Sequence, residues 1–209
     1  MTAPDGTPGA LARYYRFHAR IYDATRWSFL FGRTAVLEAL PAEPAHILEV
    51  GCGTGRNLAW LARRHPRARL TGLDLAPAML ARARRRLAPF GTRVRLEERA
   101  YGAAPGGPPA YDLVLFSYAL SMFNPGWEAA LAAARADLRP GGWLAVVDFH
   151  ATPQRWFERW MGVNHVRMQG HLRPVLQRDF ATRTDDVRPA YGGLWSYLLF
   201  VGARGDLKP

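Results

Sequence analysis

Three glycines and two acidic residues are the part of this sequence whose types and spacing could do chemistry. The stretch ILEVGCGTG places Glu49 two residues before Gly51, and Gly53 and Gly55 follow at alternate positions. Glycines directly after a buried strand let the backbone turn sharply and approach a ligand closely. Asp74 ends the next apolar run, RLTGLDL. A carboxylate at that point can hold both ribose hydroxyls of a bound nucleotide.

The glycine spacing also indicates which nucleotide is bound. Dinucleotide sites use G-x-G-x-x-G and place a pyrophosphate at a helix N-terminus. Here the spacing is G-x-G-x-G, and Glu49 would repel a pyrophosphate at this turn. S-adenosylmethionine, with its positive ammonium and sulfonium, suits such an acid.

Strands and helices alternate around these residues. Expected strands are AHILEV, RLTGLDL, RVRLEER, YDLVLFSYAL and WLAVVDF, and expected helices are RNLAWLARRHP, PAMLARARRRLAPFG and GWEAALAAARADLRPGG. Two helices, at 10–26 and 31–40, precede them; a helix RWFERWMGVNHVRM and two strands, VLQRDFATRT and LWSYLLFVGAR, follow. This alternation predicts a parallel sheet covered on both faces.

Length and composition bound the domain organisation. The 209 residues suit one domain with a substantial core. We expect a disordered leader at 1–9 and a single domain at 10–209, divided into a helical lid (10–42), a cofactor-binding core (43–150) and a substrate-side helix with terminal strands (151–209). The start of the chain lacks the pattern of a signal peptide, which favours the cytoplasm. The single cysteine excludes an internal disulfide and a cysteine-cluster metal site, and the histidines show no paired ligand spacing.

The net charge of +11 has two interpretations. It can attract nucleic acid, an anionic membrane or an acidic substrate. It can also reflect coding bias, because 27 of the 28 basic residues are arginine. No RNA-binding signature accompanies the charge, so we expect no nucleic-acid partner.

Three elements in order resemble a known family. LEVGCGTG, then LTGLDLAPAML, then LRPGG before a strand are similar to the class I S-adenosylmethionine-dependent methyltransferases, over about residues 45–150. The resemblance implies an α/β, Rossmann-like, doubly wound fold with a seven-stranded, mostly parallel sheet. It also implies S-adenosyl-L-methionine as cofactor, with S-adenosyl-L-homocysteine as product. Because no metal-ligand spacing appears in the sequence, we expect no metal.

The resemblance further implies a set of cofactor contacts. Glu49 and the backbone of the glycine turn should border the methionine part, Asp74 the ribose, and Leu75 and Met79 the adenine, although Met79 also fits plain helix packing. The family often has an acid after the third strand for the adenine amino group; EERAYG lacks it, so backbone contacts are expected there. The full set of expected cofactor residues is Tyr15, Tyr22, Arg26, Glu49, Gly51, Cys52, Gly53, Thr54, Gly55, Asn57, Asp74, Leu75, Met79, Ala100, Tyr101 and Ser117.

The segments around the core resemble one branch of this family. YYRFHARIYDATRWSFLFGR, FSYALSMF, VVDFHATPQRWFERWMGVNHVR and GGLWSYLLFVGAR are together similar to the bacterial betaine-lipid N-methyltransferases. That resemblance implies trimethylation of diacylglyceryl homoserine to diacylglyceryl-trimethylhomoserine. It also implies a peripheral membrane location, a lipid substrate at an anionic surface, and a partner enzyme that makes the homoserine lipid.

Aromatic and basic residues are the expected acceptor contacts. Aromatic faces attract an amine that becomes a fixed cation, at about 0.5–2 kcal/mol per ring, and an arginine can clamp the carboxylate of homoserine or of the cofactor. The expected substrate residues are Tyr14, Arg26, Trp27, Tyr118, His150 and His165. Core packing is an equally good interpretation of each tyrosine. Two basic and aromatic segments have the composition either of interfacial helices or of packed helices with a solvated arginine face. The first contains Arg13, Arg16 and Arg20, and the second contains Arg155, Trp156, Phe157, Arg159 and Trp160.

Alignment and exclusion of water should drive methyl transfer, so a strong base is not required. Tyr22 and Asp148 are the expected catalytic residues; Asp148 ends the fifth strand, where open α/β sheets bind ligands. The alternatives are a phosphatidylethanolamine N-methyltransferase, a soluble small-molecule methyltransferase and an RNA methyltransferase. A cofactor-binding module without catalysis is a further alternative.

Overall fold

The computed structural model describes residues 30–40, 43–102, 108–163 and 165–205. The chain divides into two compact units, residues 1–31 and 32–209, and the description that follows concerns the second unit. The expected lid residues Tyr14, Tyr15, Tyr22, Arg26 and Trp27 lie outside the described residues.

A seven-stranded sheet forms the centre of this unit, with the order β3-β2-β1-β4-β5-β7-β6. The first five strands pair in parallel, and β7 runs antiparallel to both β5 and β6. The strands are β1 (His46–Val50), β2 (Arg69–Asp74), β3 (Val94–Glu98), β4 (Tyr111–Ser117), β5 (Leu138–Ala151), β6 (Ala181–Ala190) and β7 (Trp195–Ala203). Because the strand order reverses between β1 and β4, their carboxyl ends form the switch point at which such sheets bind ligands. The predicted mostly parallel, doubly wound sheet is confirmed.

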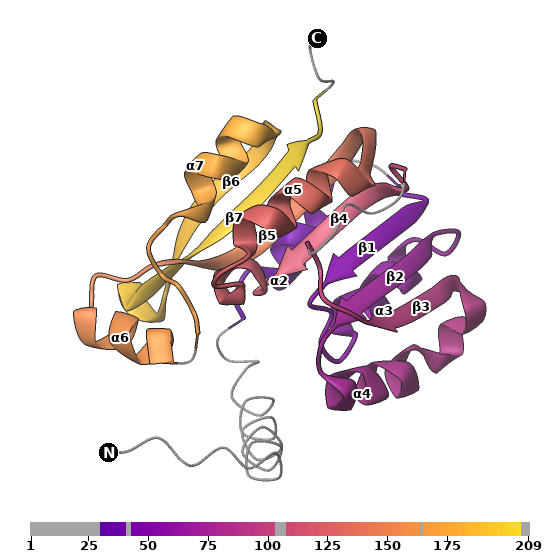
Figure 1. Ribbon diagram of the computed structural model, residues 1–209, viewed down its shortest axis with the longest axis horizontal. Coiled ribbons are helices and arrows are strands. Elements are labelled where there is room, and N and C mark those ends of the chain that lie inside the picture. The colour runs from indigo at the N-terminus through magenta and orange to yellow at the C-terminus, as the bar shows by residue number, and fades with distance from the viewer. Residues whose placement is uncertain (1–29, 41–42, 103–107, 164, 206–209) are drawn as a thin grey trace. The chain divides into compact units, whose positions relative to one another are not determined.

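Helices connect the strands (Figure 1). Gly32 precedes the first of the described helices. Pro77 opens the helix after β2, and its missing N–H costs nothing there because the first N–H groups of a helix have no intrahelical acceptor. The α-helices are α2 (Arg33–Glu38), α3 (Arg56–Arg64), α4 (Pro77–Leu87), α5 (Trp127–Asp137), α6 (Arg155–Val163) and α7 (Leu172–Asp179). Short 3-10 helices are η1 (Ala88–Arg93), η2 (Leu120–Met122) and η3 (Tyr191–Gly193). Among the described helices, none is both long enough and apolar enough to cross a membrane.

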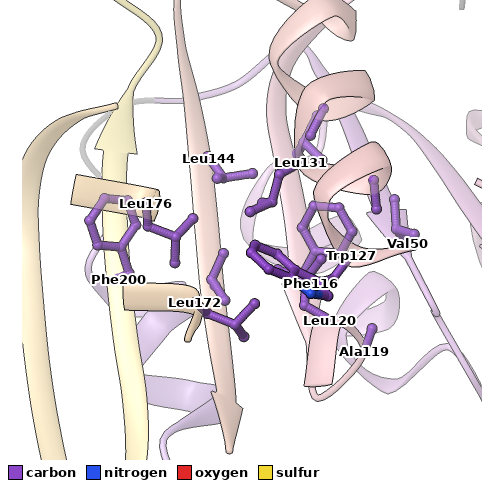
Figure 2. Close-up of a cluster of buried hydrophobic side chains, with 14 of the residues drawn as sticks. Val50, Phe116, Ala119, Leu120, Trp127, Leu131, Leu144, Leu172, Leu176 and Phe200 are labelled. Carbon is purple, nitrogen blue, oxygen red and sulfur yellow. The ribbon is translucent and has the colours of Figure 1, made fainter. Parts of the chain in front are cut away.

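Alternate side chains of the strands face two apolar layers. Figure 2 shows the layer in which α5 and α7 cover the sheet: Trp127 and Leu131 of α5 and Leu176 of α7 pack with Phe116 and Phe200. Neighbouring positions point to the opposite face, where Tyr197 and Val147 lie against Gly32 ahead of α2. The two-residue period of the strands thus places helices on both faces, as a doubly wound fold requires.

Several boundaries differ from the prediction. LRPGG, expected to close the helix that starts at Gly126, instead begins β5 at Leu138. VLQRDFATRT was expected to be one strand, but its first half belongs to α7 and its second half begins β6. Leu172 and Leu176 lie four residues apart and are both buried, which favours a helix against the sheet. The expected helix after β5 ends at Val163 rather than continuing through Met168, because the backbone turns at His165, where φ is 61°.

Candidate functional site

The glycine turn joins β1 to α3 in left-handed backbone conformations. Gly51, Gly53 and Gly55 have φ values of 71°, 53° and 72°, a region that other residues enter only at a cost. The backbone N–H groups of Gly51 and Cys52 both donate to the carbonyl oxygen of Leu73, at 2.9 Å each. These bonds tie the turn to the end of β2, so the two acids predicted to bind a nucleotide share one edge of the sheet.

Glu49 is a buried carboxylate in which one oxygen accepts a hydrogen bond and the other accepts none from the described residues. Its side chain is 1% exposed, and Asn57 of α3 donates its amide to Oε1 at 2.7 Å. Oε2 is buried and accepts no hydrogen bond from any residue in the described part of the chain. Burial raises the pKa of Glu49 to about 7, against the opposing effects of Arg33 and Asn57. A buried oxygen without a partner is costly, which indicates that a donor or cation completes this site.

Asp74 closes the other side of the turn. Its Oδ2 accepts the N–H of Gly53 at 2.7 Å, and its Oδ1 accepts the N–H of Ala76 at 2.9 Å. Each carboxylate oxygen has a second lone pair, so the side chain is oriented and still able to accept from ribose hydroxyls. Leu75, the next residue, is 66% exposed. An exposed leucine beside a ribose-binding acid is where an adenine ring would lie.

These residues fit S-adenosylmethionine. The open Oε2 of Glu49 matches its ammonium, and Asp74 matches its ribose. Leu75 offers an apolar contact to its adenine, and the positive-φ glycines permit close approach of the backbone. In the residues described, no group of three or more histidine, cysteine or acidic side chains is arranged to hold a metal ion.

Two predicted contacts of the turn are structural. Arg86 of α4 donates to the carbonyl oxygen and to Oγ1 of Thr54, the latter at 2.8 Å, so that hydroxyl is already engaged. Cys52 is 3% exposed, and burial raises the pKa of its thiol. A neutral, buried thiol does not react, so Cys52 contributes through its backbone.

The structure assigns other roles to two of the predicted adenine contacts. Met79 is 8% exposed and packs on the buried side of α4, which is the helix-packing interpretation. Tyr101 donates its hydroxyl to Asp137 at 2.8 Å, and its ring lies 6.0 Å from that of Phe116. Tyr101 therefore packs against the core cluster on the side that α5 covers. Ala100 is exposed.

The carboxyl end of β4 carries two buried side chains. Ser117 is 4% exposed, and its Oγ has no hydrogen-bond partner within the described residues. Tyr118 follows with a φ of 56° and is 1% exposed; its ring centre lies 4.8 Å from that of Phe149. A non-glycine residue in this conformation is a mark of strain that often accompanies a site. The buried ring of Tyr118 belongs to the core, however, and does not offer an open face to an acceptor.

Asp148 is placed differently from the catalytic role predicted for it. The residue is 0% exposed, and its Oδ2 accepts the N–H groups of Ala119 and Ser121, both at 3.1 Å. Its Oδ1 accepts the N–H of Phe149 at 2.8 Å. Burial raises the pKa of Asp148 to about 6. A carboxylate enclosed in this way cannot reach a bound amine, so Asp148 holds the turn after β4 in place.

Asp148→Ala tests this positioning role. The substitution leaves the three buried N–H groups without their acceptor, and we expect it to lower the free energy of unfolding by about 3 kcal/mol. Urea titration followed by circular dichroism measures the change. Asp148→Asn keeps an oxygen for Ala119 and Ser121 and should retain most of the methyl-transfer rate. A folded Asn variant without turnover would instead restore the proton-acceptor role.

The predicted histidines do not converge. His150 is half-buried beside Gly170, whose N–H donates to its carbonyl oxygen at 2.7 Å; burial and Arg173 lower its pKa. His165 is exposed, and its carbonyl oxygen accepts from the amide of Asn124 at 3.3 Å. His150 lies two residues after Asp148, near the end of β5, whereas His165 belongs to a surface turn.

Arg33 is a site residue that the sequence-based list omitted. It opens α2, is partly buried, and its positive charge lowers the pKa of both Glu49 and Tyr118. The sequence placed it in the aromatic and basic run before the first turn, but Arg26 of the same run was preferred. The hydrophobic periodicity of the sequence could not show which of the two arginines lies near the buried acid. The tertiary structure brings the charge of Arg33 to the buried acid.

Comparisons with known proteins agree with this geometry. Residues 47–142 match the family model described as a methyltransferase domain. The demethylmenaquinone methyltransferase of Thermus thermophilus is 38% identical over 125 residues, covering 60% of this chain and 56% of that protein. The trans-aconitate 2-methyltransferase of Streptomyces avermitilis is 41% identical over 148 residues, covering 69% of this chain and 54% of that protein. The chain thus spans about half the length of these relatives.

A solved structure extends the likeness of fold. The 1,6-didemethyltoxoflavin-N1-methyltransferase of Burkholderia thailandensis, crystallised with 1,6-didemethyltoxoflavin and S-adenosylhomocysteine, is 21% identical with a TM-score of 0.69, covering 99% of this chain and 94% of that one. Residues 47–142 thus match a methyltransferase domain, and the chain has the Rossmann-like fold of the class I S-adenosylmethionine-dependent methyltransferases. The resemblance to the betaine-lipid enzymes is not supported by these relatives, whose names point to other acceptors.

Proposed function

We propose that this protein transfers a methyl group from S-adenosylmethionine to an acceptor that carries a carboxylate. The observation that carries the cofactor half of this proposal is the open Oε2 of Glu49, buried at the base of the glycine turn. No described side chain completes it, and a ligand ammonium would.

Four side chains would hold the cofactor. Glu49 accepts from the ammonium, and Asp74 from the ribose hydroxyls. Leu75 covers one face of the adenine. Arg33, whose positive charge lowers the pKa of Glu49, suits the carboxylate of the methionine part. When bound, the cofactor supplies a methyl group activated by its sulfonium.

The protein's own contribution to the reaction is alignment and exclusion of water. The turn after β4, fixed by Asp148, forms a rigid wall next to the glycine turn: a Cβ on Gly51 would lie 2.9 Å from the Cβ of Ala119. With Asp148 enclosed, the described residues offer no carboxylate base at this wall. A proton released by an attacking amine therefore passes to water.

A carboxylate is what two candidate acceptors share. Trans-aconitate, named for a relative, is a carboxylic acid, and the homoserine head of the betaine-lipid precursor carries a carboxylate beside its amine. The net charge of +11 favours an anionic acceptor such as trans-aconitate. The homoserine head is zwitterionic, so only its carboxylate gains from this charge. Within this class we keep the amine of diacylglyceryl homoserine, with three successive methylations, as the more specific proposal.

An acceptor panel tests the proposal. Purified protein with labelled S-adenosylmethionine is incubated with diacylglyceryl homoserine, phosphatidylethanolamine, trans-aconitate or demethylmenaquinone, and products are read by mass spectrometry. Label in the homoserine lipid or in trans-aconitate supports a carboxylate acceptor and separates the lipid from the small molecule. Label only in phosphatidylethanolamine or demethylmenaquinone overturns the acceptor class. Cofactor binding without label in any acceptor favours a module without catalysis.

Cofactor affinity should depend on pH through Glu49. Its pKa is raised from 4.5 to about 7, so the folded protein binds a proton there between these values that the unfolded chain releases. Ionising Glu49 therefore destabilises the fold as pH rises through this window. Because the ammonium needs the ionised form, the Kd for S-adenosylhomocysteine should rise about tenfold for each pH unit below 7. Calorimetric titrations at pH 8 and pH 6 measure this, and Glu49→Gln should remove the dependence.

A further inference from the structure

Helix α6 carries an exposed apolar stripe. Trp156, Trp160 and Val163 are 63%, 51% and 80% exposed, and their spacing of four and three residues places them on one side of the helix. Phe157 and Met161, on the inner side, are 3% and 5% exposed. Large apolar side chains gathered at the surface usually mark an interaction site.

Buried Phe157 orients both tryptophans. Its ring centre lies 5.6 Å from that of Trp156 and 5.6 Å from that of Trp160. The two indoles thus project from a fixed base. This arrangement differs from a loosely exposed side chain, because the contact with Phe157 limits the rotamers that each indole can adopt.

Positive charge flanks the stripe. Arg155 and Arg159 are exposed, and neither forms an ion pair with any residue in the described ranges. Glu158, the acid of this helix, is partly buried and accepts a long hydrogen bond of 3.5 Å from Gln169. The outer face of α6 therefore combines tryptophan with uncompensated arginine.

The position of α6 relates this face to the ligand-binding edge. The helix begins four residues after the end of β5, the strand whose carboxyl end lies beside the turn after β4. Figure 1 shows α6 beyond the end of the sheet to which β5 points. Helix α6 is thus at the end of the sheet where the carboxyl ends of the parallel strands lie (Figure 1).

We infer that the outer face of α6, formed by Arg155, Trp156, Arg159, Trp160 and Val163, docks on an anionic lipid bilayer. Tryptophan prefers the headgroup level of a membrane, and arginine gains from anionic lipid there. A stable protein partner requires about 800 Å² of buried surface on each side, which three apolar side chains on a nine-residue helix do not provide. A bilayer needs no complementary surface. This inference is independent of the proposed methyl transfer.

Vesicle co-sedimentation of the full chain tests the inference. The probe is sucrose-loaded vesicles of phosphatidylcholine and phosphatidylglycerol in equal parts, compared with pure phosphatidylcholine, at low salt. We expect binding to the anionic vesicles, a loss of at least about tenfold for Trp156→Ala with Trp160→Ala, and about tenfold for Arg155→Gln with Arg159→Gln. Arg84→Gln with Arg85→Gln, two exposed arginines of α4, should change binding less than twofold.

Each other outcome overturns the inference. Wild-type protein that binds neither vesicle removes the membrane as partner. Equal losses for the α4 and α6 arginine pairs would show unspecific attraction by the net charge. A dimer in analytical ultracentrifugation that Trp156→Ala with Trp160→Ala dissociates would assign the face to a second copy. Binding of S-adenosylhomocysteine, measured in parallel, verifies that each variant is folded and separates this result from the proposed function.

Discussion

Glu49→Gln should weaken S-adenosylhomocysteine binding at pH 8 by about a hundredfold, since it removes the charge partner of a buried ammonium. The same change should not destabilise the fold. At pH 8 the buried carboxylate is ionised although burial raises its pKa from 4.5 to about 7, a penalty of about 3 kcal/mol. Glutamine removes this penalty and can still accept the hydrogen bond from Asn57. Calorimetric titration gives the affinity, and thermal unfolding gives a midpoint equal to or above that of the wild type.

Glu38→Gln is the matched control for this prediction. Glu38 ends α2 in an exposed position, so its amide variant removes the same charge away from the turn and should bind the cofactor like the wild type. Equal binding by Glu49→Gln and the wild type would contradict the role of Glu49. A large fall in the unfolding midpoint of Glu49→Gln would show that the carboxylate serves the fold instead.

Gly51→Ala should both destabilise the protein and abolish cofactor binding. The residue has a φ of 71°, and a Cβ there would lie 2.9 Å from the Cβ of Ala119. Ala119 cannot give way easily, because its N–H is held by Asp148. Left-handed strain and overpacking together should lower the free energy of unfolding by about 3 kcal/mol. Urea unfolding and titration with S-adenosylhomocysteine measure the two effects.

Substitutions at two other glycines separate the cost of left-handed strain from the cost of overpacking. Gly192 has a φ of 65° and a ψ of 21° with nothing within 4 Å of its Cβ position, so Gly192→Ala should show only the conformational cost, about 1 kcal/mol. Gly162 lies in α6 with open space and no positive φ, and Gly162→Ala should stabilise the helix by about 0.5 kcal/mol. Gly51→Ala with no larger effect than Gly192→Ala would contradict the close packing of the turn against Ala119.

Most of the sheet could be predicted from sequence because its signals are local. Apolar runs such as HILEV and YDLVLFS read as buried parallel strands, and Pro77 and Gly55 marked the helix starts. The sixth strand was predicted too early along the chain, as VLQRDFATRT. Its later part, RTDDVRPA, is charged and contains a proline, which an edge strand tolerates. Helix α7, which precedes this strand, was not predicted as a helix because the segment from Leu172 is too short to show clear periodicity.

The candidate site could be predicted only where its residues are neighbours in sequence. The glycine turn and Asp74 follow strand ends, so their edge of the sheet was predictable. Asp148 also ends a strand, but sequence cannot show that the next turn's N–H groups enclose its carboxylate. Tyr101 was assigned by position after β3, whereas its hydroxyl bonds to Asp137, which lies far away in sequence. Such contacts depend on tertiary packing that no local pattern encodes.

Binding selectivity tests the central claim most directly, because Glu49 should select a cationic nucleoside over a pyrophosphate. Purified protein at pH 8 is titrated in a calorimeter with S-adenosylhomocysteine and, separately, with NADH. We predict saturable binding of one S-adenosylhomocysteine per chain and no binding of NADH. Binding of NADH, or of neither ligand, would contradict the assignment of the glycine turn and its buried acid to S-adenosylmethionine.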